Sequence, residues 1–180
     1  MTWIVLSVGF ALLVAWLASN LAGRLHQIHI RRDDLLISLR WQLIQRESLI
    51  SRLLEEEFFR PQDATKISQA VEFANQQSDA PLSQYLVAES QVSGDLREIF
   101  AYEYQPQSTG TFSILQELAQ CCYRIELARR FHNDAVGAAI LLHKRWLVRV
   151  FRLAGNTMKP EPIDMDDTIP GELAKIIFGQ

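Results

Sequence analysis

The sequence predicts an all-α protein: an N-terminal transmembrane helix followed by an antiparallel bundle of about four long helices. Apolar residues recur every three or four positions through most of the chain, which is the period of an amphipathic helix. No segment alternates apolar and polar residues over more than a few positions, as a half-buried strand would. Glycine and proline are scarce, at 8 and 6 residues, and this scarcity argues against a turn-rich all-β fold.

The first element is the stretch of residues 1–23, which contains no charged side chain. From Trp3 to Ala22 the only polar residues are Ser7, Ser19 and Asn20. Roughly 20 apolar residues suffice to span a bilayer as a helix. A cleaved signal peptide would need a basic residue before a shorter apolar run, and no Lys or Arg precedes this one. The sequence therefore favours an uncleaved membrane anchor.

Basic residues on one side of this anchor indicate its orientation. Arg24, Arg31, Arg32 and Arg40 follow the span, and Lys and Arg are enriched on the cytoplasmic side of membrane helices. We therefore expect a single-pass protein of the cell membrane, with its N-terminus outside. The helical bundle would occupy residues 24–153 in the cytoplasm, followed by a Pro-containing acidic tail over residues 154–180.

The first bundle helix is expected from Leu25 to about Phe59. It contains no Gly or Pro, so the membrane helix can run into it without a break. Glu55, Glu56 and Glu57 are expected to form its solvated end rather than a catalytic acid cluster, because consecutive residues spread around a helix.

Three further helices are predicted from turn and capping signals. The second covers roughly residues 62–77 after Pro61, and the third covers about residues 81–104. Ser113 and Gln116 fit a capping box at the start of the fourth helix, which would continue towards Phe151. The tail is expected to be extended or loosely docked.

The composition excludes some classes of function. A formal net charge of -3 gives no positive field that would bind nucleic acid. Cys121 and Cys122 are adjacent, and a helix would point them apart, so we expect free thiols in a reducing compartment. A glycine-rich phosphate loop, a Gly-x-Ser-x-Gly elbow and a His-Glu-x-x-His motif are all absent from the sequence.

Two motifs resemble the LemA family. They are Arg31-Arg32-Asp33-Asp34-Leu35-Leu36 and the stretch from Leu127 to Val136, with Ala128-Arg129-Arg130-Phe131-His132-Asn133-Asp134 inside it. The resemblance covers about residues 21–167 and is that of a divergent, actinobacterial-like branch, since His132 stands where the family more often has Tyr. It implies a short outside N-terminus, one membrane helix and a cytoplasmic helical bundle. It implies no enzymatic activity, and we expect no catalytic residue, cofactor or metal.

Asn133 and Asp134 are unfavourable inside a helix, because both side chains compete for backbone hydrogen bonds. One interpretation is a buried polar clasp, in which Asp134 pairs with Arg31 or Arg32 and Asn133 bonds a neighbouring helix. The other is a ligand or partner site centred on His132, Asn133 and Asp134.

Two charged segments near the C-terminus could also recognise a partner. The basic residues Arg145, Arg149 and Arg152 share one helix face, which could contact anionic lipid or an acidic partner, or simply complement the helix dipole. Asp164, Asp166 and Asp167 lack the Gly and Glu of a calcium loop and are expected in a solvated tail or in one that folds back onto that face. The candidate structural or interaction residues are Arg31, Arg32, Asp34, Arg129, His132, Asn133, Asp134, Arg145, Arg149 and Arg152.

The function that follows is a single-pass membrane protein that presents a helical bundle to protein partners, as a scaffold or adaptor. One alternative is a membrane-associated hydrolase or nucleotide-binding enzyme that uses His132 and Asp134. Another is an organiser of anionic lipid surfaces that acts through the basic end of the fourth helix.

Overall fold

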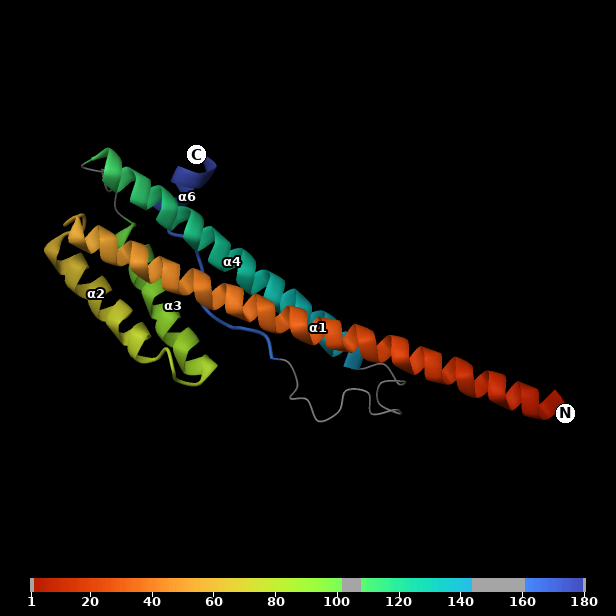
Figure 1. Ribbon diagram of the computed structural model, residues 1–180. Coiled ribbons are helices and arrows are strands. Elements are labelled where there is room, and N and C mark those ends of the chain that lie inside the picture. The colour runs from red at the N-terminus through yellow and green to blue at the C-terminus, as the bar shows by residue number, and fades with distance from the viewer. Residues whose placement is uncertain (1, 102–107, 144–160, 180) are drawn as a thin grey trace. The chain divides into compact units, whose positions relative to one another are not determined.

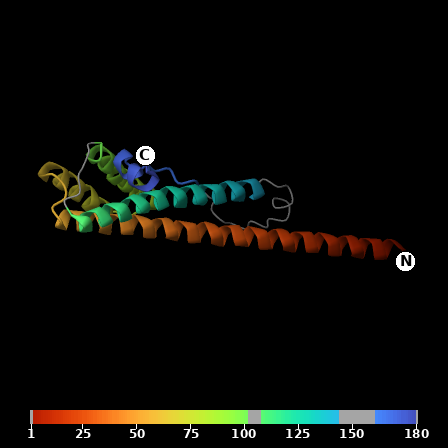
Figure 2. The same cartoon turned by 90° about the horizontal axis from the view of Figure 1, so that it is seen from above.

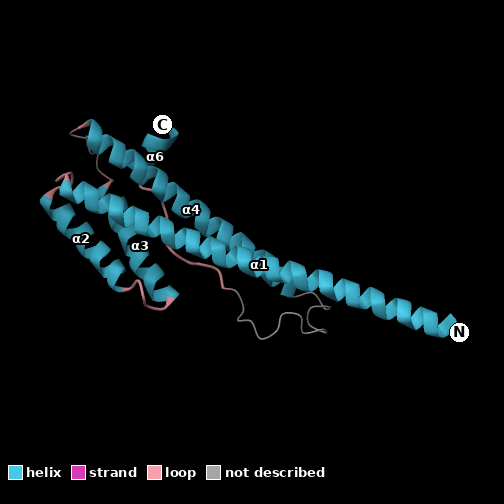
Figure 3. Cartoon of the chain, viewed as in Figure 1, coloured by secondary structure: helices cyan, strands magenta, loops and turns pink. Residues whose placement is uncertain are grey.

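A computed structural model describes residues 2–101, 108–143 and 161–179, and within these ranges it contains helices and no strand (Figures 1 and 3). The all-α prediction is therefore confirmed. The chain divides into two compact units. The first unit comprises residues 1–36 and 131–163, and the second comprises residues 37–130 and 164–180.

Helix α1 runs without interruption from Thr2 to Glu55. The predicted continuity between the uncharged N-terminal segment and the first bundle helix is thus confirmed. Among the residues whose side chains are described, no helical stretch is long and apolar enough to cross a membrane.

A left-handed residue ends α1. Glu57 has φ 51°, the Phe58 N–H donates to the Leu53 carbonyl at 3.1 Å, and the Glu57 N–H donates to the Leu54 carbonyl at 3.1 Å. This pair of bonds is a Schellman motif, in which the left-handed residue is usually glycine. The acidic end is exposed, as predicted, and the helix stops before the buried Phe58 and Phe59.

Helices α2 and α3 span Pro61–Gln76 and Leu82–Ile99. Pro61 occupies the first turn of α2, as expected for a residue whose missing N–H costs nothing there. Helix α3 ends earlier than the predicted Tyr104. Phe100 ends it and is buried with Phe58 and Phe59, with ring centroids 6.3 Å from each.

Helix α4 spans Thr109–His143 and begins earlier than predicted. The cap is Ser108, whose Oγ accepts a hydrogen bond from the Thr111 N–H at 3.1 Å, so the expected capping box at Ser113 and Gln116 is wrong. Gly137 does not interrupt the helix. The predicted continuation to Phe151 lies outside the described residues.

In the second unit the C-terminal part of α1 is antiparallel to α4, and Figures 1 and 2 both show the two helices side by side there. Two contacts fix the direction. Arg52 pairs with Glu117 at 3.3 Å, and the Arg124 Nε donates to Gln42 at 2.9 Å. Helices α2 and α3 are likewise antiparallel, since Lys66 of α2 pairs with Asp95 and Glu98 near the end of α3. The core is built from apolar side chains, among them Leu39, Leu43, Ile50, Leu53, Ile67, Leu96, Leu118 and Ile125.

The C-terminal tail is more ordered than the sequence predicts. Residues 161–170 are non-helical, and a further helix, α6, spans Gly171–Phe178. Leu173 is fully buried, and Gly179 closes the helix with φ 66°, a conformation that glycine adopts without strain.

Candidate functional site

The second unit contains a buried cluster of charged side chains. Arg46 of α1 donates through Nη2 to the Glu89 carboxylate at 2.6 Å and through Nη1 to the Ser93 hydroxyl at 2.7 Å. Its Nη2 also donates to the Glu89 backbone carbonyl at 3.0 Å. Both members of the ion pair are essentially inaccessible to solvent. These bonds favour one register of α1 against α3, because a buried charge displaced from its partner would lose the ion pair that compensates its burial.

A second carboxyl, Glu47, adjoins this pair. Burial, followed by the neighbouring Glu89, raises the pKa of Glu47 to about 8, against the opposing influence of Arg46 and Asn75. Glu89 Oε1 is buried and has no hydrogen-bond partner among the described residues. Because the pKa of Glu47 lies above neutral pH, we expect Glu47 to keep its proton there.

The geometry of this cluster suits a structural role. Glu89 is fully buried, Glu47 and Ser93 are nearly so, and Tyr85 covers the cluster with burial raising its pKa. No substrate can reach groups that solvent does not reach. In the described part of the chain, no three His, Cys, Asp or Glu side chains are arranged to hold a metal ion.

The two cysteines are free and buried, which confirms the prediction of free thiols. Burial raises the pKa of Cys121 and raises that of Cys122 to about 12. Neither thiol is therefore a nucleophile near neutral pH, since the thiolate is the reactive form.

The acidic tail docks on the second unit through two aspartates. The Asp166 N–H donates to the Ser90 Oγ at 3.0 Å, and its carboxylate pairs with Arg97 at 2.7 Å. Arg129 donates through Nε to Asp167 at 2.5 Å. Burial by itself would raise the pKa of Asp166, but hydrogen bonds from Thr168 and the Arg97 guanidinium together lower it.

These contacts correct the prediction of a solvated tail. Asp166 and Asp167 are paired with arginines of α3 and α4, and Asp164 alone is exposed. Whether the tail also meets the basic residues at 145, 149 and 152 lies outside the described residues.

In the first unit Asn133 binds the backbone just before these aspartates. Its Nδ2 donates to the Ile163 carbonyl at 2.9 Å, and its Oδ1 accepts from the Ile163 N–H at 2.8 Å. The predicted partner, a neighbouring helix, is therefore wrong. An amide presents one donor and one acceptor side by side, which matches the two backbone groups of a single extended residue.

Asp134 is exposed, as are Arg31 and Asp34, so the predicted clasp is not buried. Whether Asp134 pairs with Arg32 lies outside the described side chains. His132 is buried at 3% exposure and so faces away from Asp134. Residues two positions apart lie on different helix faces, so these two side chains do not converge on one substrate atom.

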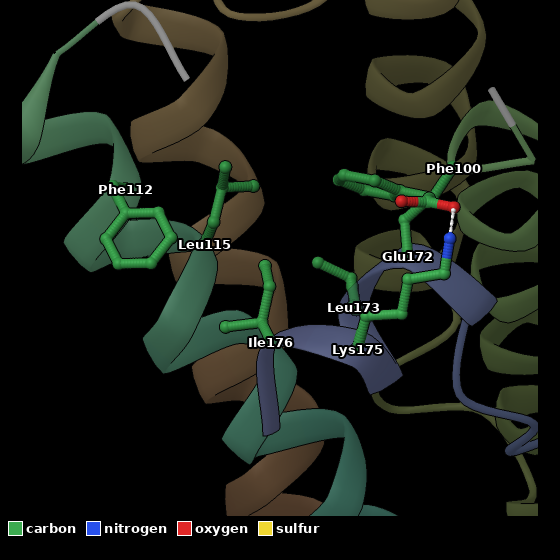
Figure 4. A pocket seen from close by; sticks show the side chains of 7 residues that line it. All are labelled: Phe100, Phe112, Leu115, Glu172, Leu173, Lys175 and Ile176. Atoms are coloured by element: carbon green, nitrogen blue, oxygen red, sulfur yellow. Dashed lines mark hydrogen bonds and ion pairs between the residues drawn. The ribbon is translucent and has the colours of Figure 1, made fainter. Parts of the chain in front are cut away.

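Helix α6 forms one wall of a cavity of about 280 Å³ in the second unit (Figure 4). Phe112 and Leu115 of α4 line it on one side, and Phe100 lies on the other side, near Glu172 (Figure 4). At the α6 side, Lys175 pairs with Glu172 at 2.7 Å, and Figure 4 shows this pair next to Leu173. The cavity residues from α6 are Glu172, Leu173, Lys175 and Ile176.

Sequence reasoning missed Glu89, Ser90 and Arg97 as site residues. Glu89 carries a detectable signal, because it falls at helical spacing on the stripe of Leu86, Val92 and Leu96, where an apolar residue is expected. Ser90 and Arg97 carry no such signal, since serine and arginine are common at ordinary surface positions of a helix.

Comparison with known proteins identifies no relative: no protein-family model matches the chain, and neither a curated protein nor a solved structure matches it. The resemblance to the LemA family stays a prediction from the two motifs.

Proposed function

We propose that this chain is a single-pass membrane protein that presents a cytoplasmic helical bundle to protein partners, as a scaffold or adaptor. The observation that carries the proposal is the character of the N-terminal part of α1. It is helical from Thr2, it has no charged side chain up to Gly23, and it leads directly into the bundle.

The exposure of large apolar side chains on this segment supports anchoring. Trp3 is 84% exposed, Leu12 66% and Trp16 62%, with Leu6, Val8 and Leu13 also exposed. Water penalises such surface by about 25 cal/mol for each Å², whereas lipid does not. A helix that is apolar on all sides needs either a protein core or a bilayer around it.

The orientation rests on Arg24 and the arginines that follow it, which favour a cytoplasmic bundle. The motif resemblance to the LemA family supports the same arrangement. A scaffold or adaptor is favoured over an enzyme because the buried charges in the second unit do not reach solvent, whereas the tail contacts lie at its surface.

The test introduces a charge into the proposed anchor. Arg at the centre of a membrane helix costs about 2.5–3.5 kcal/mol. We expect Leu12→Arg, alone or with Val8→Arg, to move the protein out of the carbonate-washed membrane fraction. The matched control is Ile37→Arg, which places the same charge at a site of similar exposure, 67%, on α1 beyond the anchor.

Retention of wild type and Ile37→Arg with loss of the Leu12 variants would support the anchor. Recovery of wild type in the soluble fraction, or equal behaviour of all variants, would contradict it.

A further inference from the structure

We infer that the surface that holds the tail on the second unit is a recognition site for an acidic segment of a partner protein, and that the tail competes with that segment. This inference rests on the proposed function, since it names the kind of partner that the bundle takes. The contacts of this tail-binding surface come from Ser90 and Arg97 of α3 and from Arg129 of α4.

The tail-binding surface recognises an extended acidic segment by its backbone and by its charge. Ser90 accepts the N–H of Asp166, which any residue but proline supplies. Arg97 and Arg129, from two different helices, each pair with one of two consecutive carboxylates. Arginine clusters are the usual device for binding acidic motifs.

Apolar side chains flank these two carboxylates. Met165 precedes them and is buried, and Leu173 of α6 follows and is fully buried. The chemistry that fits is therefore an apolar residue, two acidic residues and, a few positions later, a short amphipathic helix. Asn133 holds the residue before this segment, within the first unit, through the Ile163 backbone.

Two features mark the tail as an occupant that a partner can displace. The ion pair of Arg97 and Asp166 lies at the solvent edge, with side chains 46% and 30% exposed, where water weakens such pairs. In addition, α6 leaves the cavity of about 280 Å³ against Phe100, Phe112 and Leu115 unfilled (Figure 4). A helix with a larger apolar side chain in place of Ile176 would make contacts that the tail does not.

Competition within one chain makes a measurable prediction. A tethered segment competes at an effective concentration that is about millimolar. A free acidic segment therefore binds weakly until the tail is loosened, and its apparent affinity rises with the fraction of open molecules.

The experiment uses the full-length protein in detergent, which makes it independent of membrane insertion. The probe is a fluorescent peptide with the sequence of residues 161–179, and binding is followed by anisotropy. We compare wild type with the open variant Asp166→Ala/Asp167→Ala. The matched control is Glu161→Ala/Asp164→Ala, which removes the same charge at two exposed positions of the tail.

We expect the probe to bind the open variant about tenfold or more tighter than wild type and the control. A probe with Ile176→Phe should bind tighter still. Equal affinity for the open variant, wild type and control, or no binding to any of them, would overturn the inference.

Charge reversal distinguishes binding at the tail-binding surface from non-specific electrostatic attraction. Adding Arg97→Glu/Arg129→Glu to the open variant should abolish binding of the probe, and a probe with Asp166→Lys/Asp167→Lys should then bind. This rescue also shows that the reversed variant is folded, and circular dichroism checks its helix content. Undiminished binding of the acidic probe to the reversed variant would overturn the inference. Failure here leaves the membrane test with Leu12→Arg unaffected.

Discussion

Glu47 adjoins the buried ion pair of Arg46 and Glu89 inside the bundle. Because Arg46 is already paired with Glu89, burial and the neighbouring Glu89 favour the protonated form of Glu47. The groups that influence the pKa of Glu47 come from three helices: Arg46 from α1, Asn75 from α2 and Glu89 from α3.

This arrangement predicts a pH dependence of stability. The pKa of Glu47 rises from 4.5 to about 8 in the folded chain, so the native state binds a proton that the unfolded state has released between these values. The free energy of unfolding therefore falls as pH rises from about 4.5 to about 8 and then levels off. Glutamine at position 47 is neutral at every pH. In Glu47→Gln, the decrease of the unfolding free energy over this pH range should therefore be smaller by about 2–4 kcal/mol.

Urea unfolding of both proteins at about pH 5 and about pH 8.5 measures the difference. Glu117→Gln, a change at an exposed carboxyl, is the control and should retain the wild-type slope. An equal change of the unfolding free energy with pH in wild type and Glu47→Gln would contradict the raised pKa of Glu47. Asp166, whose pKa is lowered, loses its stabilising pair only at more acidic pH and does not affect this comparison.

At the scale of elements, periodicity predicts the helices well and their ends less well. The bounds of α2 agree with prediction to about one residue at each end, because Pro61 marks its start in the sequence. Helix α1 ends at Glu55 because Glu57 adopts a left-handed conformation. A glutamate gives no sequence signal for that conformation, which is usually found at glycine. The end of α1 coincides with the burial of Phe58 and Phe59 in the core. Such tertiary contacts cannot be read from a local sequence pattern.

The end of α1 supplies a second prediction. A left-handed conformation costs a non-glycine residue about 1–2 kcal/mol, so Glu57→Gly should raise the free energy of unfolding by about 0.5–1 kcal/mol. Glu56→Gly is the matched control, because only Glu57 has positive φ among the described non-glycine residues of the chain. Thermal unfolding distinguishes them. Equal destabilisation by the two changes would contradict the strained cap.

Helix α6 and the tail contacts show what the sequence alone could not supply. Leu173, Ile176 and Ile177 have helical spacing, but the segment is too short for a helix to be predicted from this periodicity. Asn133 is a polar helix residue whose side chain needs hydrogen-bond partners, and the Ile163 backbone supplies them, whereas Asp134 is exposed. The sequence could not identify this partner, because every residue has backbone groups.

At the scale of the whole molecule, the chain joins an uncharged helical segment to a helical bundle with a docked acidic tail. In the second unit, a core of packed apolar side chains holds the bundle together and encloses the buried ion pair of Arg46 and Glu89. The proposed placement of the uncharged segment in a membrane rests on its composition and on the arginines after it. The central claim is therefore that residues 1–23 cross a membrane and leave the bundle in the cytoplasm.

The most direct test is cysteine labelling of intact cells that express the chain, with a maleimide that does not cross membranes. Thr2→Cys and Ser38→Cys place an exposed thiol before and after the proposed anchor, and the native cysteines are buried, so the unmodified chain is the blank. The account predicts that Thr2→Cys is labelled in intact cells and Ser38→Cys only after the cells are opened. Labelling of Ser38→Cys in intact cells, or protection of Thr2→Cys until they are opened, would contradict it.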